Sequence, residues 1–152
     1  MLAAEQLRVV EAAIAAHRGT EGAALPILHH IQSALGFVPQ AVLPVVAEAL
    51  NRSRAELHGV ASFYHDFRDA PAGRHLVQLC QAEACQAMGV RQVTRESEQR
   101  LGLALGETSP DGALTLEAVY CLGLCACAPA ALVDGAPLGR VDAAALAAAV
   151  GR

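Results

Sequence analysis

The first part of the chain carries apolar residues at the three- and four-residue spacing of amphipathic helices. Stripes of this kind cover residues 3–16, 25–35 and 42–50. Gly36 stands where the second stripe ends and predicts a C-cap, whereas Pro44 removes one helical hydrogen bond and is expected to shift the start of the third helix. Ser53 and Glu56 form a capping box, whose hydroxyl and carboxylate satisfy reciprocal backbone donors of a short fourth helix. We therefore predict a small helical bundle and assign this domain to residues 1–70.

The pattern changes after the turn-rich segment Asp69–Gly73. The elements predicted beyond it are a strand at 75–79, a helix at 87–105 that Gly106 stops, a strand at 114–120, a hairpin at 131–139 around the Asp134-Gly135 turn, and a closing helix at 141–150. This order of strands and helices is typical of an α/β layer arrangement. We place the second domain at residues 74–152.

Composition and charge exclude several classes of protein. Of the 152 residues, 54% are hydrophobic and 17% charged, which excludes a disordered tail over most of the length. The formal net charge is −4, so the basic face of a nucleic-acid-binding protein is not expected. No apolar stretch approaches the roughly 18–20 residues that span a bilayer, and residues 1–18 lack the apolar core of a signal peptide. We expect a cytoplasmic protein with no direct membrane insertion and no nucleic-acid partner.

Four of the five cysteines form two pairs, Cys80-x4-Cys85 and Cys121-x3-Cys125. Cytosolic thiols stay reduced, which favours metal or redox chemistry over a disulfide framework. Each pair directly follows a predicted strand. If the two strands are parallel neighbours joined by a helical crossover, their C-terminal ends lie at one edge of the sheet, and the four thiolates can surround one compact site.

The spacing of the pairs favours an iron–sulfur centre. Structural zinc usually takes pairs two to four residues apart, which puts the first pair at the wide edge of that range. Iron–sulfur proteins accept a C-x4-C opening, and Rieske ligation would need histidines that these segments lack. Buried core thiols are a further interpretation, disfavoured by the small residues Ala84, Gly123 and Ala126, which would let backbone N–H groups approach a cluster. We favour a [2Fe-2S] cluster with Cys80 and Cys85 on one iron and with Cys121 and Cys125 on the other.

Other candidate residues indicate structural roles. Cys127 is too close to Cys125 for both to bind a compact cluster, so we interpret it as a small buried hydrophobe, with ligand swapping as the alternative. His29 and His30 are adjacent on a helix, face different directions, and are expected to be solvated or to cap the helix. A polar seam between the two halves, or else a docking surface, is expected from His58, Tyr64, His65 and Asp66. Nucleotide-binding, hydrolase and zinc-protease motifs are lacking, so no catalytic residue is predicted.

Several motifs carry a resemblance to a known family. They are Leu25–Gln32, Gly36–Pro39, Ser53–Val60, Ser62–Tyr64, the paired cysteines, and Cys121-Leu122-Gly123-Leu124-Cys125 followed by Ala128-Pro129. Together they cover nearly the whole chain and resemble the thioredoxin-like [2Fe-2S] ferredoxin subunits of NADH-dependent complexes. The resemblance implies an N-terminal helical domain, a thioredoxin-like α/β domain, and the two cysteine pairs as cluster ligands.

Within this family, His58–Phe67 most resembles the gamma subunit of molybdenum-containing, NAD-dependent formate dehydrogenase. The alternatives are the small ferredoxin subunits of NADH:quinone oxidoreductase and of NAD-reducing hydrogenase. The resemblance implies a non-catalytic electron-transfer subunit that exchanges electrons with a flavin/NADH-binding subunit, in a complex that also holds a large catalytic subunit. A zinc-stapled structural adaptor and an independent thiol oxidoreductase are the hypotheses from other classes; the second expects a Cys-x-x-Cys motif, which the chain lacks.

Overall fold

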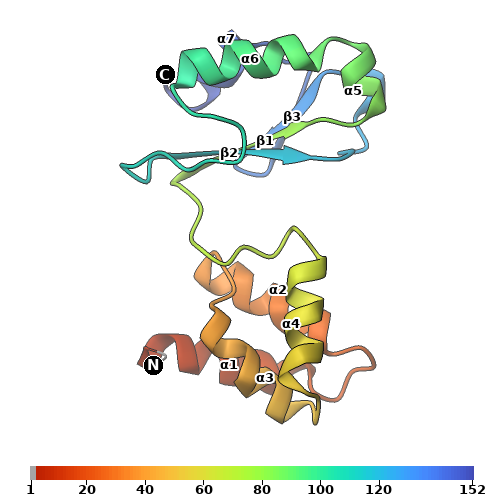
Figure 1. Ribbon diagram of the computed structural model, residues 1–152, viewed down its shortest axis with the longest axis vertical. Helices are drawn as coiled ribbons and strands as arrows, with labels where there is room; N and C mark the ends of the chain where they lie inside the picture. Colours follow the sequence, from red (N-terminus) through yellow and green to blue (C-terminus); the bar gives the residue numbers. More distant parts are fainter. Residues whose placement is uncertain (1–2) are drawn as a thin grey trace. The chain divides into compact units, whose positions relative to one another are not determined.

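The N-terminal helices are built around one apolar cluster. The computed structural model describes residues 3–152, and the chain divides after Pro71 into a helical unit (residues 1–71) and an α/β unit (residues 72–152) (Figure 1). The helical unit contains α1 (Ala4–His17), α2 (Ala24–Leu35), the 3-10 helix η1 (Gln40–Val42), α3 (Leu43–Ala49) and α4 (Arg54–Phe63). Fully buried side chains on α2, among them Ile27, Leu28 and Ile31, lie at the centre of this cluster.

The ends of these helices follow the local sequence signals. The Ser53 hydroxyl accepts a hydrogen bond from the Glu56 N–H at 3.2 Å, and the Glu56 carboxylate accepts one from the Ser53 N–H at 2.8 Å, so the capping box is confirmed. Gly36 adopts φ +81° and ends α2, as its position predicted. Pro44 lies in the first turn of α3, where a missing N–H costs no helical hydrogen bond.

The α/β unit is a mixed four-stranded sheet with helices. It contains β1 (His75–Cys80), α5 (Glu83–Ala87), α6 (Val90–Leu101), β2 (Leu114–Val119), the 3-10 helix η2 (Cys125–Cys127), β3 (Ala130–Val133), β4 (Ala136–Gly139) and α7 (Ala143–Ala149). The strand order is β2-β1-β3-β4, with β1 and β2 parallel and the other pairs antiparallel. The predicted mixed α/β class is confirmed.

The parallel pair places the cysteine segments at one edge of the sheet. His75 pairs with Leu114 at one end of the ladder, and Cys80 pairs with Val119 at the other. Both strands therefore stop at the same edge, where the chain continues into Cys80–Cys85 and into Cys121–Cys125. The parallel arrangement on which the predicted site depended is present.

One face of the sheet carries the core, and the other carries both polar and apolar side chains. Helices α6 and α7 cover one face (Figure 1), and Val77, Leu79 and Leu116 are fully buried in the core cluster of this unit. Alternate positions of the same strands, Gln78 and Glu117, are half-buried and joined by a hydrogen bond of 3.4 Å. This alternation is the period of two that a strand imposes. Within residues 3–152 no helix is both long and apolar enough to cross a membrane.

Two predicted helices differ from the structure. The helix expected at 87–105 is replaced by the short helix α5 and by α6, because Gly89 at φ +87° and Gly102 at φ +66° take left-handed conformations at the two ends of α6. The closing helix begins at Ala143 instead of Val141, since Asp142 is its N-cap and accepts the Ala145 N–H at 2.7 Å.

Candidate metal centre

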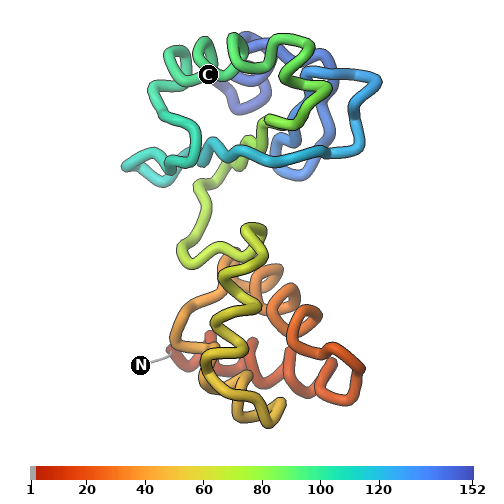
Figure 2. Tube along the Cα trace, turned by 45° about the vertical axis from the view of Figure 1, so that its right-hand side comes forward, coloured from red at the N-terminus to blue at the C-terminus, as the bar shows by residue number. Residues whose placement is uncertain are grey.

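The two cysteine segments lie side by side beyond the ends of β1 and β2. Both views of the chain trace place the segment that follows β2 next to α5 (Figures 1 and 2). The first pair is buried, with Cys80 3% and Cys85 2% exposed, whereas Cys121 and Cys125 face solvent. All five cysteines are free thiols. The site therefore has a buried side and an open side.

Backbone N–H groups from both segments converge on the Cys80 sulfur. Burial is the largest single influence and raises the pKa of this thiol, whereas hydrogen bonding from the Ala82 N–H and from the Cys85 thiol lowers it. The N–H groups of Cys121 and Leu122 add to this effect, and the pKa of Cys80 is lowered below its ordinary value. A donor from the second segment thus reaches the first cysteine of the first segment.

Cys85 holds its proton more tightly than an ordinary thiol. Its position within α5 puts it on the buried side of the site, and burial is the main cause that raises its pKa. Hydrogen bonding to Cys80 and the negative charges of Cys80 and Cys125 raise it further. Like charges crowd here, so a group that takes four thiolates must bring positive charge with it.

The second pair is closer to solvent and is held by an unusual backbone. The sulfurs of Cys121 and Cys125 are 3.8 Å apart. Their hydrogen bond, followed by the negative charge of Cys121, raises the pKa of Cys125. Cys121 adopts φ +72° and Gly123 φ +74°; the first is uncommon for a residue with a side chain and stores strain at this turn.

The donor set fits a binuclear cluster of soft ligands. Four thiols form two pairs, and the pairs are linked through the N–H groups of Cys121 and Leu122 on Cys80 and through the charge of Cys125 on Cys85. Across residues 3–152, no group of three His, Cys, Asp or Glu side chains has a geometry for a single metal ion. A [2Fe-2S] cluster takes four thiolates, two on each iron, and the number of paired thiols matches this requirement.

Cys127 differs from the prediction. It is half-buried instead of buried, because η2 places it at the rim of the sheet, where its side chain lies against Gly139 at the end of β4. Sequence reasoning also missed Gly139 itself. The signal available was a glycine at a predicted strand end, which indicates close approach of another chain segment, but it does not say which segment.

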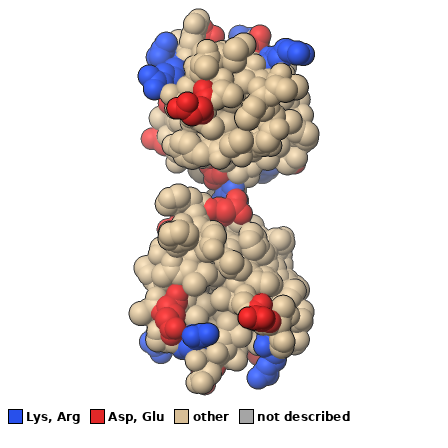
Figure 3. Space-filling view, turned by 90° about the vertical axis from the view of Figure 1, so that its right-hand side faces the viewer, with Lys and Arg blue, Asp and Glu red and all other residues tan. Residues whose placement is uncertain are grey.

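The surface on the side of the cysteine segments is largely uncharged. Figure 3 views the molecule from the side on which these segments lie in Figure 1, and the charged side chains of the α/β unit lie mostly toward the margin of that face. Tyr120, 76% exposed, directly precedes Cys121, and Met88, 62% exposed, follows α5. The backbone hydrogen bonds that lower the pKa of Cys80 come from the N–H groups of Ala82, Cys121 and Leu122.

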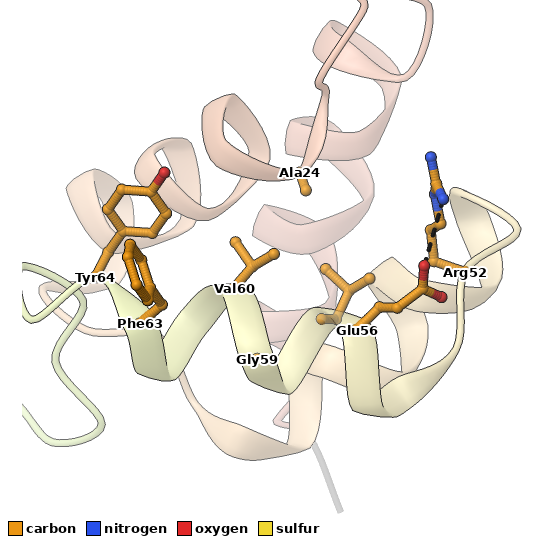
Figure 4. A pocket seen from close by; sticks show the side chains of 8 residues that line it. Ala24, Arg52, Glu56, Gly59, Val60, Phe63 and Tyr64 are labelled. Carbon is orange, nitrogen blue, oxygen red and sulfur yellow. Dashed lines mark hydrogen bonds and ion pairs between the residues drawn. The ribbon is translucent and has the colours of Figure 1, made fainter.

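The polar residues singled out near the end of α4 belong to a different surface. Tyr64 stacks edge-on against Phe63 and Phe67, with ring centroids 5.2 and 6.2 Å apart. Phe63, Tyr64 and Val60 line a hollow of about 620 Å³ in the helical unit, which extends to Arg52 and Glu56 (Figure 4). His58 and His65 are exposed and do not line it. The seam or docking role of this group stays a prediction.

The two adjacent histidines have separate ring partners. His29 is exposed and packs against Phe67, with ring centroids 4.9 Å apart. His30 is half-buried, and its Nδ1 lies 3.3 Å from Nε2 of His17. The expectation of a solvated or capping role is therefore wrong for His30, because a histidine on the preceding helix offers it a hydrogen bond.

Comparison with known proteins extends over both units. The model of the family described as thioredoxin-like [2Fe-2S] ferredoxin matches residues 10–152. An NADH-quinone oxidoreductase subunit of Rhizobium meliloti is 39% identical over 90% of this chain and 82% of its own length. The corresponding NADH-quinone oxidoreductase subunit of Pseudomonas aeruginosa is 36% identical over 78% of this chain and 72% of its own. A crystal structure of NAD+-reducing [NiFe]-hydrogenase aligns with a TM-score of 0.68 and 30% identity, over 84% of this chain and 22% of that one.

Proposed function

This chain belongs to the thioredoxin-like [2Fe-2S] ferredoxin family, and we propose that it is a one-electron carrier within an NAD(H)-linked complex. The cofactor of the family is a [2Fe-2S] cluster, which agrees with the predicted cofactor and disfavours the zinc-stapled adaptor. We assign residues 1–70 as a helical domain and residues 74–152 as the ferredoxin domain. The chain itself has no catalytic role in this proposal; it holds and tunes the cofactor.

The observation that carries the proposal is the approach of the second cysteine segment to the first. The N–H groups of Cys121 and Leu122 act on the Cys80 sulfur, although 40 or so residues of chain separate them. The proposed ligands are Cys80 and Cys85 on one iron and Cys121 and Cys125 on the other. When bound, the cluster takes up and releases one electron.

The surroundings of the cysteines set how readily that electron is accepted. Burial of Cys80 and Cys85 opposes added negative charge, which lowers the reduction potential. Hydrogen bonds from backbone N–H groups to the Cys80 sulfur act in the opposite direction. With no cationic side chain among the influences on Cys80, we expect a potential in the range of plant-type ferredoxins, about −400 mV.

The cofactor proposal is tested on the anaerobically purified chain. Iron and acid-labile sulfide are expected at two of each per chain, with a visible charge-transfer spectrum and an electron paramagnetic resonance (EPR) signal after one-electron reduction. A colourless protein that contains zinc, or one without labile sulfide, would overturn the proposal.

For the host complex we propose an NAD-dependent formate dehydrogenase, with a flavin/NADH-binding subunit and a large catalytic subunit as partners in the cytoplasm. The resemblance of residues 58–67 supports this choice. The relatives named as subunits of NADH-quinone oxidoreductase, and the hydrogenase structure, support an NAD(H)-linked complex and make those two hosts the alternatives.

Co-purification decides between the hosts. An affinity-tagged chain is isolated from its native cells, and the recovered complex is assayed for NAD+ reduction by formate, NAD+ reduction by hydrogen, and quinone reduction by NADH. Formate-dependent NAD+ reduction is the expected activity. Recovery of only the hydrogen- or quinone-dependent activity would replace the formate dehydrogenase assignment and leave the electron-carrier proposal intact.

A further inference from the structure

The end of strand β4 approaches the turn that carries Cys125 more closely than a side chain would permit. A Cβ placed on Gly139 would lie 2.5 Å from the Cys127 Cβ and 3.2 Å from the Cys127 carbonyl oxygen. The φ of Gly139 is outside the left-handed region, so the backbone conformation itself does not require glycine. The requirement at Gly139 is therefore purely one of space, and the group that fills the space is Cys127.

Hydrogen bonds fix the same turn to the same strand end. The Arg140 N–H, next to Gly139, donates to the Cys127 carbonyl at 2.6 Å, and the Val141 N–H donates to the Pro129 carbonyl at 2.9 Å. Within the turn, the Cys127 N–H donates to the Leu124 carbonyl at 2.9 Å. Because η2 spans only Cys125–Cys127, a displacement of Cys127 is transmitted directly to Cys125.

We propose that Gly139 is a positioning residue for the metal centre, and that Cys127 is the group through which it acts. The close contact sets how near η2 lies to the end of the sheet, and so where the Cys125 sulfur stands relative to Cys80 and Cys85. Cys127 then serves as a spacer between β4 and the site and is not a ligand. This inference rests on the proposed role of Cys125 as a ligand.

The close approach can be tested from both residues, because a Cβ added at Gly139 would meet the Cβ of Cys127. Gly139→Ala should displace η2, change the EPR spectrum and the midpoint potential of the reduced protein, and accelerate loss of iron to a chelator about 10-fold, the lower end of the effect of outer contacts on metal affinity. Gly139→Ala with Cys127→Gly removes the opposing Cβ and should restore all three properties. Gly139→Ala with Cys127→Ala keeps that Cβ and should not.

Two further variants separate positioning from stability. Gly73→Ala is the matched steric control: its Cβ would lie 2.7 Å from the Leu114 backbone, at the opposite end of β2 from the cysteines, and Gly73 also lacks a left-handed φ. It should lower the unfolding temperature and leave the EPR spectrum and potential unchanged. Cys127→Val presses on Gly139 from the other side and should reproduce the spectral change, which keeps the test open if Gly139→Ala does not fold.

The outcomes distinguish this inference from the proposed function. Wild-type protein without iron and labile sulfide overturns the proposed function before any variant is made. A wild-type cluster whose EPR spectrum and potential are unaltered by Gly139→Ala and by Cys127→Val overturns only the positioning role. Loss of the cluster in Cys127→Ala alone would show that Cys127 is a ligand and would also overturn it.

Discussion

The helical unit and the α/β unit both have an apolar core, but only the core of the α/β unit includes thiols. In the helical unit, Ile27, Leu28 and Ile31 are buried among other apolar side chains, and no thiol is present. In the α/β unit, the buried cluster extends to two thiols, Cys80 and Cys85, whose thiolate forms would repel one another. Apolar packing alone accounts for the core of the helical unit. The core of the α/β unit must also hold two cysteines whose thiolates repel one another unless a positively charged group binds between them.

The largest expected effect lies in the α/β unit. Cys80→Ser removes the proposed ligand that receives N–H groups from both cysteine segments. We expect the affinity for iron to fall by more than the roughly 10- to 100-fold that loss of an outer contact costs. The purified variant should therefore contain much less iron than wild type. Iron analysis and EPR of the anaerobic protein measure this.

Cys127→Ser provides the control for Cys80→Ser. It makes the same chemical change two residues after the proposed ligand Cys125 and should retain the cluster. An unchanged reduced EPR signal in Cys80→Ser would remove Cys80 from the ligand set.

The next effect is expected in the core of the helical unit. Leu28→Ala opens a cavity in the core of the helical unit and should lower its free energy of unfolding by about 2–5 kcal/mol. Urea unfolding followed by far-UV circular dichroism measures the loss, while the EPR spectrum should stay that of wild type. Leu79→Ala, at a fully buried position of β1, is the counterpart in the α/β unit and should disturb both readouts. An altered EPR spectrum in Leu28→Ala would mean that the core of the helical unit also affects the metal centre.

Gly123→Ala tests the backbone conformation of the second cysteine segment. The φ of +74° strains any residue with a Cβ, at about 1–2 kcal/mol, although the space around Gly123 is open. We expect a lower thermal unfolding midpoint and weaker cluster retention. Gly36→Ala at the end of α2 has a similar φ of +81° and open space, so it should cost similar stability without touching the cluster. Equal cluster retention in the two variants would contradict the prediction.

The smallest effect concerns acid stability. Hydrogen bonds from His75, at 2.7 Å, and from the Leu76 N–H lower the pKa of Asp134. The unfolded chain therefore takes up this proton first as pH falls, so the stabilisation is present above the ordinary value of about 3.9 and is lost below it. Asp134→Asn should be less stable than wild type near pH 7 and should lose less stability on acidification.

Glu56→Gln is the matching variant in the helical unit. The Ser53 N–H and hydroxyl lower the pKa of Glu56, so the sign of the pH dependence is the same. Urea midpoints between pH 7 and pH 3 measure both variants. If the difference in urea midpoint between variant and wild type grew as the pH falls, these two carboxylates would not be the groups whose ionised forms stabilise the folded chain.

Local signals in the sequence predicted the helix ends that depend on neighbouring residues, as at Ser53, Glu56 and Gly36. The family and its cofactor were also predicted correctly. The break at Gly89 was missed because apolar residues continue across it and an isolated glycine does not state its φ. The half-burial of Cys127 and its close approach to Gly139 depend on η2 and the end of β4 meeting in space, which no local pattern records. The ligand assignment of the four cysteines stays a prediction.

The pairing of Cys80 with Val119 determines where this chain tolerates insertions. Extra residues in the exposed turn around Pro110 and Asp111 lengthen the connection while both strand ends keep their places. One residue added inside β2 would reverse every following side chain from one face to the other and carry Cys121 away from its partner segment. Relatives that share this site should therefore vary in length between the strands and keep constant spacing within them.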